Sequence, residues 1–112
     1  MGSRVVDLLA GGDRSAWPLA GDQLYVDLDL GVGNLPAGTR LAIGEAIIEV
    51  TEPAHTGCAK FSSRFGSAAL RLVNSPEGRD LRLRGLNARV VQPGTVRRGD
   101  AVRRLAPEAG RP

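Results

Sequence analysis

The sequence predicts one small domain that is mainly β with a few short helices, an α+β fold. The length of 112 residues is that of a single ordinary domain. Short runs rich in Leu, Val and Ile alternate with clusters of Gly and Pro, as is typical of short strands joined by turns. One longer stretch, residues 58–74, instead repeats its apolar residues at helical spacing. Residues 1–105 are expected to form the domain and residues 106–112 a flexible tail.

The N-terminal quarter predicts a helix, a turn-rich stretch and a strand. Residues 3–10 predict a short helix that Ser3 caps and a Gly pair ends. Trp17, in the turn-rich stretch, is expected to pack against the body of the domain. Residues 24–30 alternate apolar and polar side chains, which predicts a half-buried strand.

The middle of the chain predicts a β-hairpin. It follows a Gly-rich loop over residues 31–38. Residues 39–43 and 46–51 are expected to be its strands, and Gly44 suits the first position of a two-residue turn between them. Pro53 ends the second strand, because proline has no N–H to donate to a sheet.

The rest of the chain predicts helices and then strands. Gly66 is expected to divide the helical stretch 58–74 into two. Ser75 and Pro76 form a helix-start signal, although the residues up to Arg84 alternate Leu and Arg and so also fit a strand. The last strands are expected at residues 86–92 and 101–105.

Composition narrows the classes of function. The formal net charge is +3, but the basic residues are not interleaved with aromatic ones, so no nucleic-acid partner is expected. No apolar run approaches the roughly 18 residues of a membrane span, and the N-terminus lacks a signal-peptide core. Together with a free cysteine, these features predict a cytoplasmic protein without a membrane partner. The Arg-, Ala- and Gly-rich usage indicates a bacterial source.

The chain has one cysteine, Cys58, and one histidine, His55. A single cysteine excludes an internal disulfide and almost excludes a Cys-based zinc site. Free cysteines are usually small buried hydrophobes. Here, however, both residues lie in a polar loop that contains Gly and Pro, between an apolar strand and a helix. These neighbours favour a functional thiol.

The surroundings of Cys58 favour its thiolate form. Backbone N–H groups at the start of a helix and the charges of Lys60 and Arg64 stabilise an anion. His55 is either a base for the thiol proton or an exposed loop residue. A thiolate attacks disulfides, accepts persulfide sulfur or ligates a soft metal.

These segments also form a longer pattern. Residues 39–51 are followed by a loop with Pro and then by Cys58, and Gly33-Asn34-Leu35 precedes them. The closing segments are residues 83–90 and 93–100. In this order, over roughly residues 4–105, the chain resembles the MOSC domain, which is named after the C-terminal domain of molybdenum-cofactor sulfurases. The resemblance implies a barrel-like β fold and an essential cysteine at Cys58.

The resemblance also implies specific roles. In the family this cysteine is thought to carry sulfur as a persulfide, and in amidoxime-reducing relatives it ligates the molybdenum of the pterin cofactor. His55 and Lys60 would tune the thiolate of Cys58. The residues expected to hold the cofactor's phosphate and pterin are Asn34, Arg84, Asn87 and Arg89. Pyridoxal phosphate is not expected, because in the large sulfurases it belongs to a separate domain.

The chain departs from the family in three places. Gly33 stands where the family has Glu, and the arginine that many members carry shortly before their cysteine is missing before Cys58. The family's N-terminal strands are also missing, which would leave an open sheet edge and predicts a homo-oligomer. Three functions remain open: a sulfur carrier or transferase, a binding module for molybdenum cofactor with Cys58 as metal ligand, and a non-catalytic oligomerising or regulatory domain.

Overall fold

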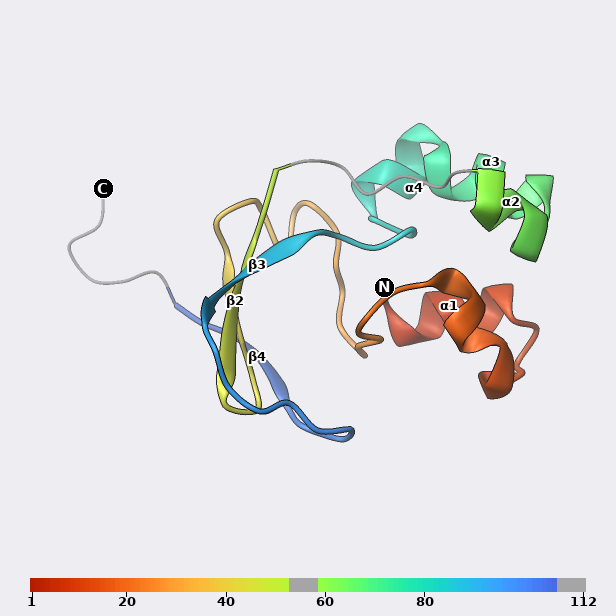
Figure 1. Cartoon of the computed structure of the whole chain (residues 1–112). Coiled ribbons are helices and arrows are strands. Elements are labelled where there is room, and N and C mark those ends of the chain that lie inside the picture. Colours follow the sequence, from red (N-terminus) through yellow and green to blue (C-terminus); the bar gives the residue numbers. More distant parts are fainter. Residues whose placement is uncertain (53–58, 107–112) are drawn as a thin grey trace.

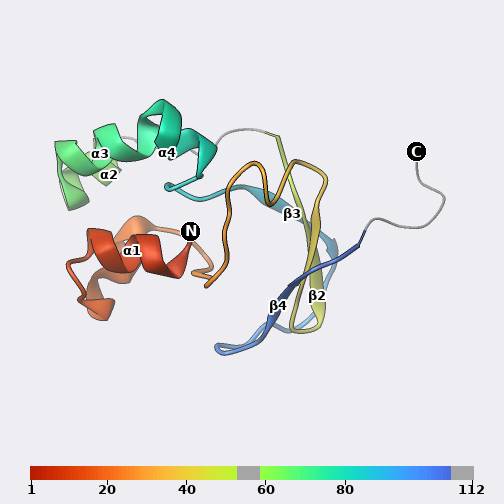
Figure 2. The same ribbon diagram turned by 180° about the vertical axis from the view of Figure 1, so that it is seen from behind.

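The computed structural model describes residues 1–52 and 59–106 and confirms the α+β class. The helices gather at one end of the molecule and the strands at the other, with the N-terminus between them (Figures 1 and 2). In chain order the elements are α1 (Ser3–Leu9), the 3-10 helix η1 (Arg14–Ala20), β1 (Arg40–Ile43), β2 (Ala46–Val50), α2 (Ala59–Phe65), α3 (Ser67–Asn74), α4 (Pro76–Asp80), β3 (Ala88–Gln92) and β4 (Val102–Arg104). Of the predicted tail over residues 106–112, all but residue 106 lie outside the described residues. None of the helices described is long and apolar enough to cross a membrane.

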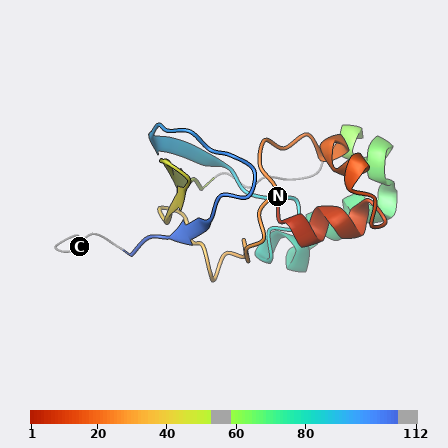
Figure 3. The same ribbon diagram turned by 90° about the horizontal axis from the view of Figure 1, so that it is seen from below.

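The strands form one antiparallel sheet in the order β3-β2-β1-β4. Ile43 pairs with Ala46 across the predicted two-residue turn, and Gly44 has the positive φ of 54° that such a turn requires at its first position. β3 and β4 are the two edges of the described sheet, at its opposite margins (Figure 3). The sheet is therefore open within the described residues, and the barrel-like closure implied by the resemblance is not confirmed.

The two faces of the sheet differ in polarity. On the inner face Leu41, Ile43 and Val50 are buried in a core that also contains Leu30 and Leu35. The outer face carries a ladder of charges across three strands. Its centre is Glu49 on β2, which accepts hydrogen bonds from Arg40 on β1 at 3.0 Å and from Arg89 on β3 at 3.1 Å. These hydrogen bonds hold the pKa of Glu49 below its ordinary value, and the hydrogen bond from Arg40 has the largest effect.

A second core joins the helices, in which Phe61 and Val73 are buried against Val6 of α1. Gly66 separates α2 from α3 with a φ of 95°, as the sequence predicts. Ser75 caps α4: its hydroxyl accepts a hydrogen bond from the N–H of Gly78 at 3.0 Å. The alternative of a strand up to Arg84 was wrong, because residues 81–84 form turns.

The predicted strand over residues 24–30 was also wrong. Val26 forms only an isolated bridge with Gly2, through hydrogen bonds with the backbone of Met1 and Ser3. The alternation nevertheless describes burial correctly in its second half, since Val26, Leu28 and Leu30 pack on the core of the sheet. Alternation reports which side chains are buried, and an extended segment can meet that pattern without a neighbouring strand.

The cap of α1 also differs from the prediction. Gly2 occupies the position before the helix, and no side chain makes a capping hydrogen bond there. The first backbone N–H of the helix, that of Ser3, instead donates to the carbonyl of Val26 at 2.7 Å. A backbone carbonyl from a distant segment thus satisfies one of the free N–H groups at this helix end, where the predicted side-chain cap is absent. Trp17 packs against the helical core, as predicted.

Candidate functional site

The predicted site residues His55 and Cys58 lie outside the described residues, but the two anchors of their segment are described. On the strand side, Thr51 follows β2 directly. Its backbone N–H and its hydroxyl both donate to the carbonyl of Asn87, each at 3.0 Å. One predicted cofactor residue, Asn87, therefore contacts the chain just before this segment.

On the helix side, α2 begins at Ala59, immediately after Cys58. Its residue Phe61 is 3% exposed and packs in the helical core. The guanidinium of Arg84 lies 5.2 Å from the centre of the Phe61 ring, within cation–π range. Lys60, the neighbouring residue on α2, is exposed. Helix α2 is thus anchored in the core by Phe61, whereas the charged side chain of Lys60 is exposed to solvent.

Arg84 is buried and already paired. Its Nη1 donates to both carboxylate oxygens of Asp22 at 2.9 Å, and its Nη2 donates to the carbonyl of Ala20 at 2.9 Å. The amine of Met1 lies 3.3 Å from the same carboxylate. Of the guanidinium nitrogens, the buried Nε has no hydrogen-bond partner among the described residues. Asp22 therefore compensates the charge that the resemblance assigns to a cofactor phosphate.

The other two predicted cofactor residues have separate partners. The amide of Asn34 donates to the carbonyl of Asp29 at 2.7 Å, within the loop over residues 31–38. Arg89 lies on the outer face of the sheet, against Glu49. Within the described chain the hydrogen bonds printed for Asn34, Arg84, Asn87 and Arg89 go to different partners. Their assignment to a cofactor stays a prediction.

A positioning residue that the sequence did not single out is Arg82. Its φ is 49°, which is rare for a residue other than glycine. Its Nη1 donates to the carbonyls of Leu30, at 3.0 Å, and Leu35, and so ties the loop over residues 31–38 to the turn after α4. Burial lowers the pKa of Arg82 from its ordinary value. The Leu-Arg alternation of this segment gave no signal for such a role.

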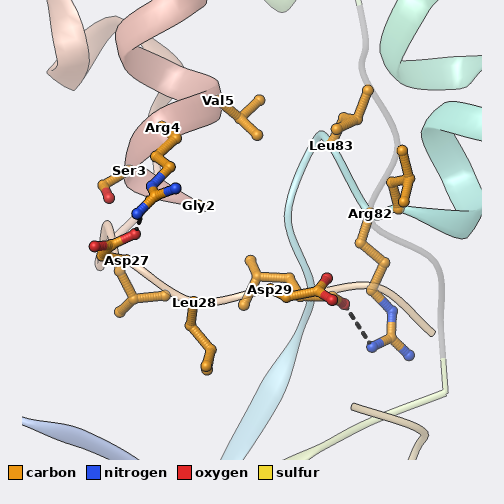
Figure 4. Close-up of a pocket in the computed structure, with 12 residues that line it drawn as sticks. Gly2, Ser3, Arg4, Val5, Asp27, Leu28, Asp29, Arg82 and Leu83 are labelled. Carbon is orange, nitrogen blue, oxygen red and sulfur yellow. Dashed lines mark hydrogen bonds and ion pairs between the residues drawn. The ribbon is translucent and has the colours of Figure 1, made fainter. Parts of the chain in front are cut away.

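Arg82 also lines a cavity of about 530 Å³ between the start of α1 and the turn after α4 (Figure 4). Across this cavity, Arg4 forms an ion pair with Asp27 at 2.9 Å, and both side chains are largely exposed. An ion pair exposed to water contributes little to stability. Among the described residues, moreover, no group of three or more His, Cys, Asp or Glu side chains is placed to hold a metal ion.

The described part of the chain defines a small α+β domain in which the segment carrying the single cysteine joins an inner strand of the sheet to a helix packed in the core. Residues 15–103 match the family model of the MOSC domain, and the chain belongs to this family. The match spans Cys58 and every other predicted site residue. No curated protein and no solved structure matches the chain.

Proposed function

We propose that this MOSC-domain protein carries sulfur as a persulfide on Cys58 and passes it to an acceptor linked to sulfur or molybdenum-cofactor metabolism. One observation carries the proposal: the match to the MOSC family spans the only cysteine of the chain. The family resemblance assigns the essential thiol to this position, and no other residue of the chain can supply a thiol.

The anchors of the segment support the proposal. Thr51 is bound to Asn87 at one end, and Phe61 is buried beneath Arg84 at the other. Both described neighbours of the segment that carries Cys58 are therefore held by contacts within the domain. Lys60 adds an exposed positive charge two residues after Cys58. Such a charge favours the thiolate, which is the reactive form.

The proposed chemistry balances without an external oxidant or reductant. The Cys58 thiolate attacks the terminal sulfur of a donor persulfide, R–S–SH. A sulfur–sulfur bond forms on Cys58 while the donor's sulfur–sulfur bond breaks, and the donor leaves as the thiolate R–S⁻. A nucleophile on the acceptor then attacks the same terminal sulfur and regenerates the Cys58 thiolate. Such a carrier suits a reducing compartment such as the cytoplasm, where a free thiol persists.

Sulfur loading provides the direct test. After incubation with glutathione persulfide, the intact protein is expected to gain the mass of one sulfur atom, and dithiothreitol should remove it. Cys58→Ser should gain nothing, because it leaves the chain without any thiol. Circular dichroism serves as the folding control for the variant. A wild-type protein that stays at its original mass under these conditions would overturn the proposal.

The role of Lys60 is tested by the rate of Cys58 alkylation with iodoacetamide as a function of pH. Lys60→Gln removes an exposed charge close in sequence, so the midpoint of the profile should rise by about 0.5 pH unit. Arg71→Gln, which removes an exposed charge from α3, is the matched control and should leave the midpoint in place. Identical profiles for all three proteins would remove Lys60 from the site.

A further inference from the structure

We propose that the cavity between the start of α1 and the turn after α4 binds a free α-amino acid with an apolar side chain. The inference does not rest on the proposed function. The volume of about 530 Å³ lies within the range of small-ligand sites, about 300–1,000 Å³. Four charged side chains line the cavity, and two of them, Arg4 and Asp27, pair with each other at 2.9 Å. The other two, Arg82 and Asp29, have opposite signs and form no ion pair among the described residues.

The guanidinium of Arg82 is fixed on one side and accessible on the other. Its Nη1 donates to the carbonyls of Leu30 and Leu35. Its Nε and Nη2 form the remaining edge, and neither has a hydrogen-bond partner among the described residues. They are not buried, because the only buried side-chain polar atom without a partner in the described chain is Nε of Arg84. Two parallel N–H groups match a carboxylate, and a side chain that is already held loses little entropy when it binds one.

Asp29 supplies the opposite charge from the same turn. Its Oδ1 accepts a hydrogen bond from the N–H of Gly31 at 2.9 Å, and the carbonyl that Arg82 binds belongs to Leu30, the residue between them. The other carboxylate oxygen, Oδ2, has no hydrogen-bond partner among the described residues. Figure 4 shows the side chains of Asp29 and Arg82 on one side of the cavity, across from the pair that Arg4 forms. The two unpaired charges are therefore available to one ligand.

A ligand that complements this cavity carries an anionic and a cationic group close together on an apolar body. The head group of a free α-amino acid has this arrangement: its carboxylate accepts from Arg82 and its ammonium group donates to Asp29. A simple anion would meet the charge of Asp29 and a simple cation that of Arg82, so the cavity discriminates against both. The rest of the wall includes Leu28, Leu81 and Leu83, and Leu81 is 53% exposed. An apolar ligand side chain placed there removes apolar area from water.

A nuclear magnetic resonance titration with L-phenylalanine and L-leucine tests the proposal. Binding is expected to shift the amide resonances of Gly31 and Leu83, which line or adjoin the cavity, and to leave that of Val102 on β4 in place. Hydrocinnamate lacks the ammonium group of phenylalanine and phenethylamine lacks its carboxylate, and each should bind at least about tenfold more weakly than L-phenylalanine. Glycine should also bind more weakly, because it has no apolar side chain. The proposal fails if neither amino acid binds, or if either analogue binds as tightly as L-phenylalanine.

Asp29→Asn is the most informative variant, because its amide oxygen can still accept from the N–H of Gly31 while the negative charge is lost. It should bind L-phenylalanine about tenfold more weakly than the wild type does. It should bind hydrocinnamate at least as tightly as the wild type does, because the repulsion between two anions is removed. Asp27→Asn is the matched control: it changes a carboxylate that is 67% exposed and paired with Arg4, and should bind both compounds like the wild type.

Arg82→Lys should weaken the binding of L-phenylalanine and of hydrocinnamate alike, because an ammonium group cannot replace the two-pronged contact of a guanidinium. Circular dichroism is the folding control for this variant, and the result for Asp29→Asn decides the question if Arg82→Lys does not fold. Equal affinity of the wild type and Asp29→Asn for L-phenylalanine would overturn the proposal. The titration needs no sulfur donor and the sulfur-loading test needs no amino acid, so either proposal can fail without the other.

Discussion

Asp22→Ala is expected to lower the free energy of unfolding by about 3–5 kcal/mol, the usual effect of removing one partner from a buried ion pair. The side chains of Asp22 and Arg84 are each only 10% exposed, and the carboxylate accepts both bonds from one guanidinium nitrogen at 2.9 Å. Without Asp22, the full positive charge of Arg84 stays buried beside Phe61. Urea denaturation followed by circular dichroism measures the change.

An exposed ion pair of the same chain is the matched control. Arg4 and Asp27 form a pair at 2.9 Å, but their side chains are 87% and 67% exposed. Asp27→Ala should therefore change the free energy of unfolding by less than about 1 kcal/mol. The double variant Asp22→Leu with Arg84→Met should recover only part of the loss, because it removes the Asp22–Arg84 pair and keeps apolar volume but leaves the buried amine of Met1 without its carboxylate partner. Equal effects of Asp22→Ala and Asp27→Ala would contradict the structural role of the buried pair.

The same ion pair contacts α2, the helix that follows the segment carrying Cys58. Arg84 touches Phe61 on α2, the helix that begins directly after Cys58, and Asp22 fixes the position of Arg84. A shift of Arg84 would therefore release the helix that anchors this segment. What the structure shows for Arg84 is a positioning contact with Phe61 of α2.

Features of the fold whose signal spans a few neighbouring residues could be predicted from the sequence. The turn at Gly44, the break at Gly66 and the cap at Ser75 each depend on the chemistry of one residue and its immediate neighbours. The segment over residues 24–30 could not be predicted in the same way. Its alternation describes burial, whereas its backbone partner is the N-terminus, about which the segment itself holds no information.

In the candidate site, too, the contacts between residues distant in the sequence could not be predicted. The sequence predicts a thiol at Cys58 from local chemistry and from the family pattern, and the match over residues 15–103 supports the pattern. The partner of Arg84 lies 62 residues away in the chain. No spacing rule connects an arginine to an aspartate at that separation. The sequence can therefore indicate Arg84 as an anion ligand without indicating that the carboxylate of Asp22 already pairs with it.

Gly78→Ala is expected to destabilise the fold by about 3 kcal/mol, at the upper end of the usual cost of overpacking. Gly78 is buried in α4, where the chain turns back against the end of α3. A Cβ atom there would overlap the carbonyl oxygen of Leu72 and lie 2.8 Å from that of Val73. Both obstacles are backbone atoms, which cannot move aside as a flexible side chain does. Thermal or urea unfolding of the variant measures the loss.

The matched control is Gly33→Ala in the loop over residues 31–38. A Cβ at Gly33 has no atom within 4 Å, and the residue does not have a positive φ. This substitution should leave the fold intact and raise the free energy of unfolding by up to about 1 kcal/mol, because alanine restricts the unfolded chain. If both variants unfolded alike, the close contact between α3 and α4 would not constrain the fold. If only Gly78→Ala is destabilised, the glycine at position 78 is required by space, because α4 can return against α3 only where no side chain intervenes.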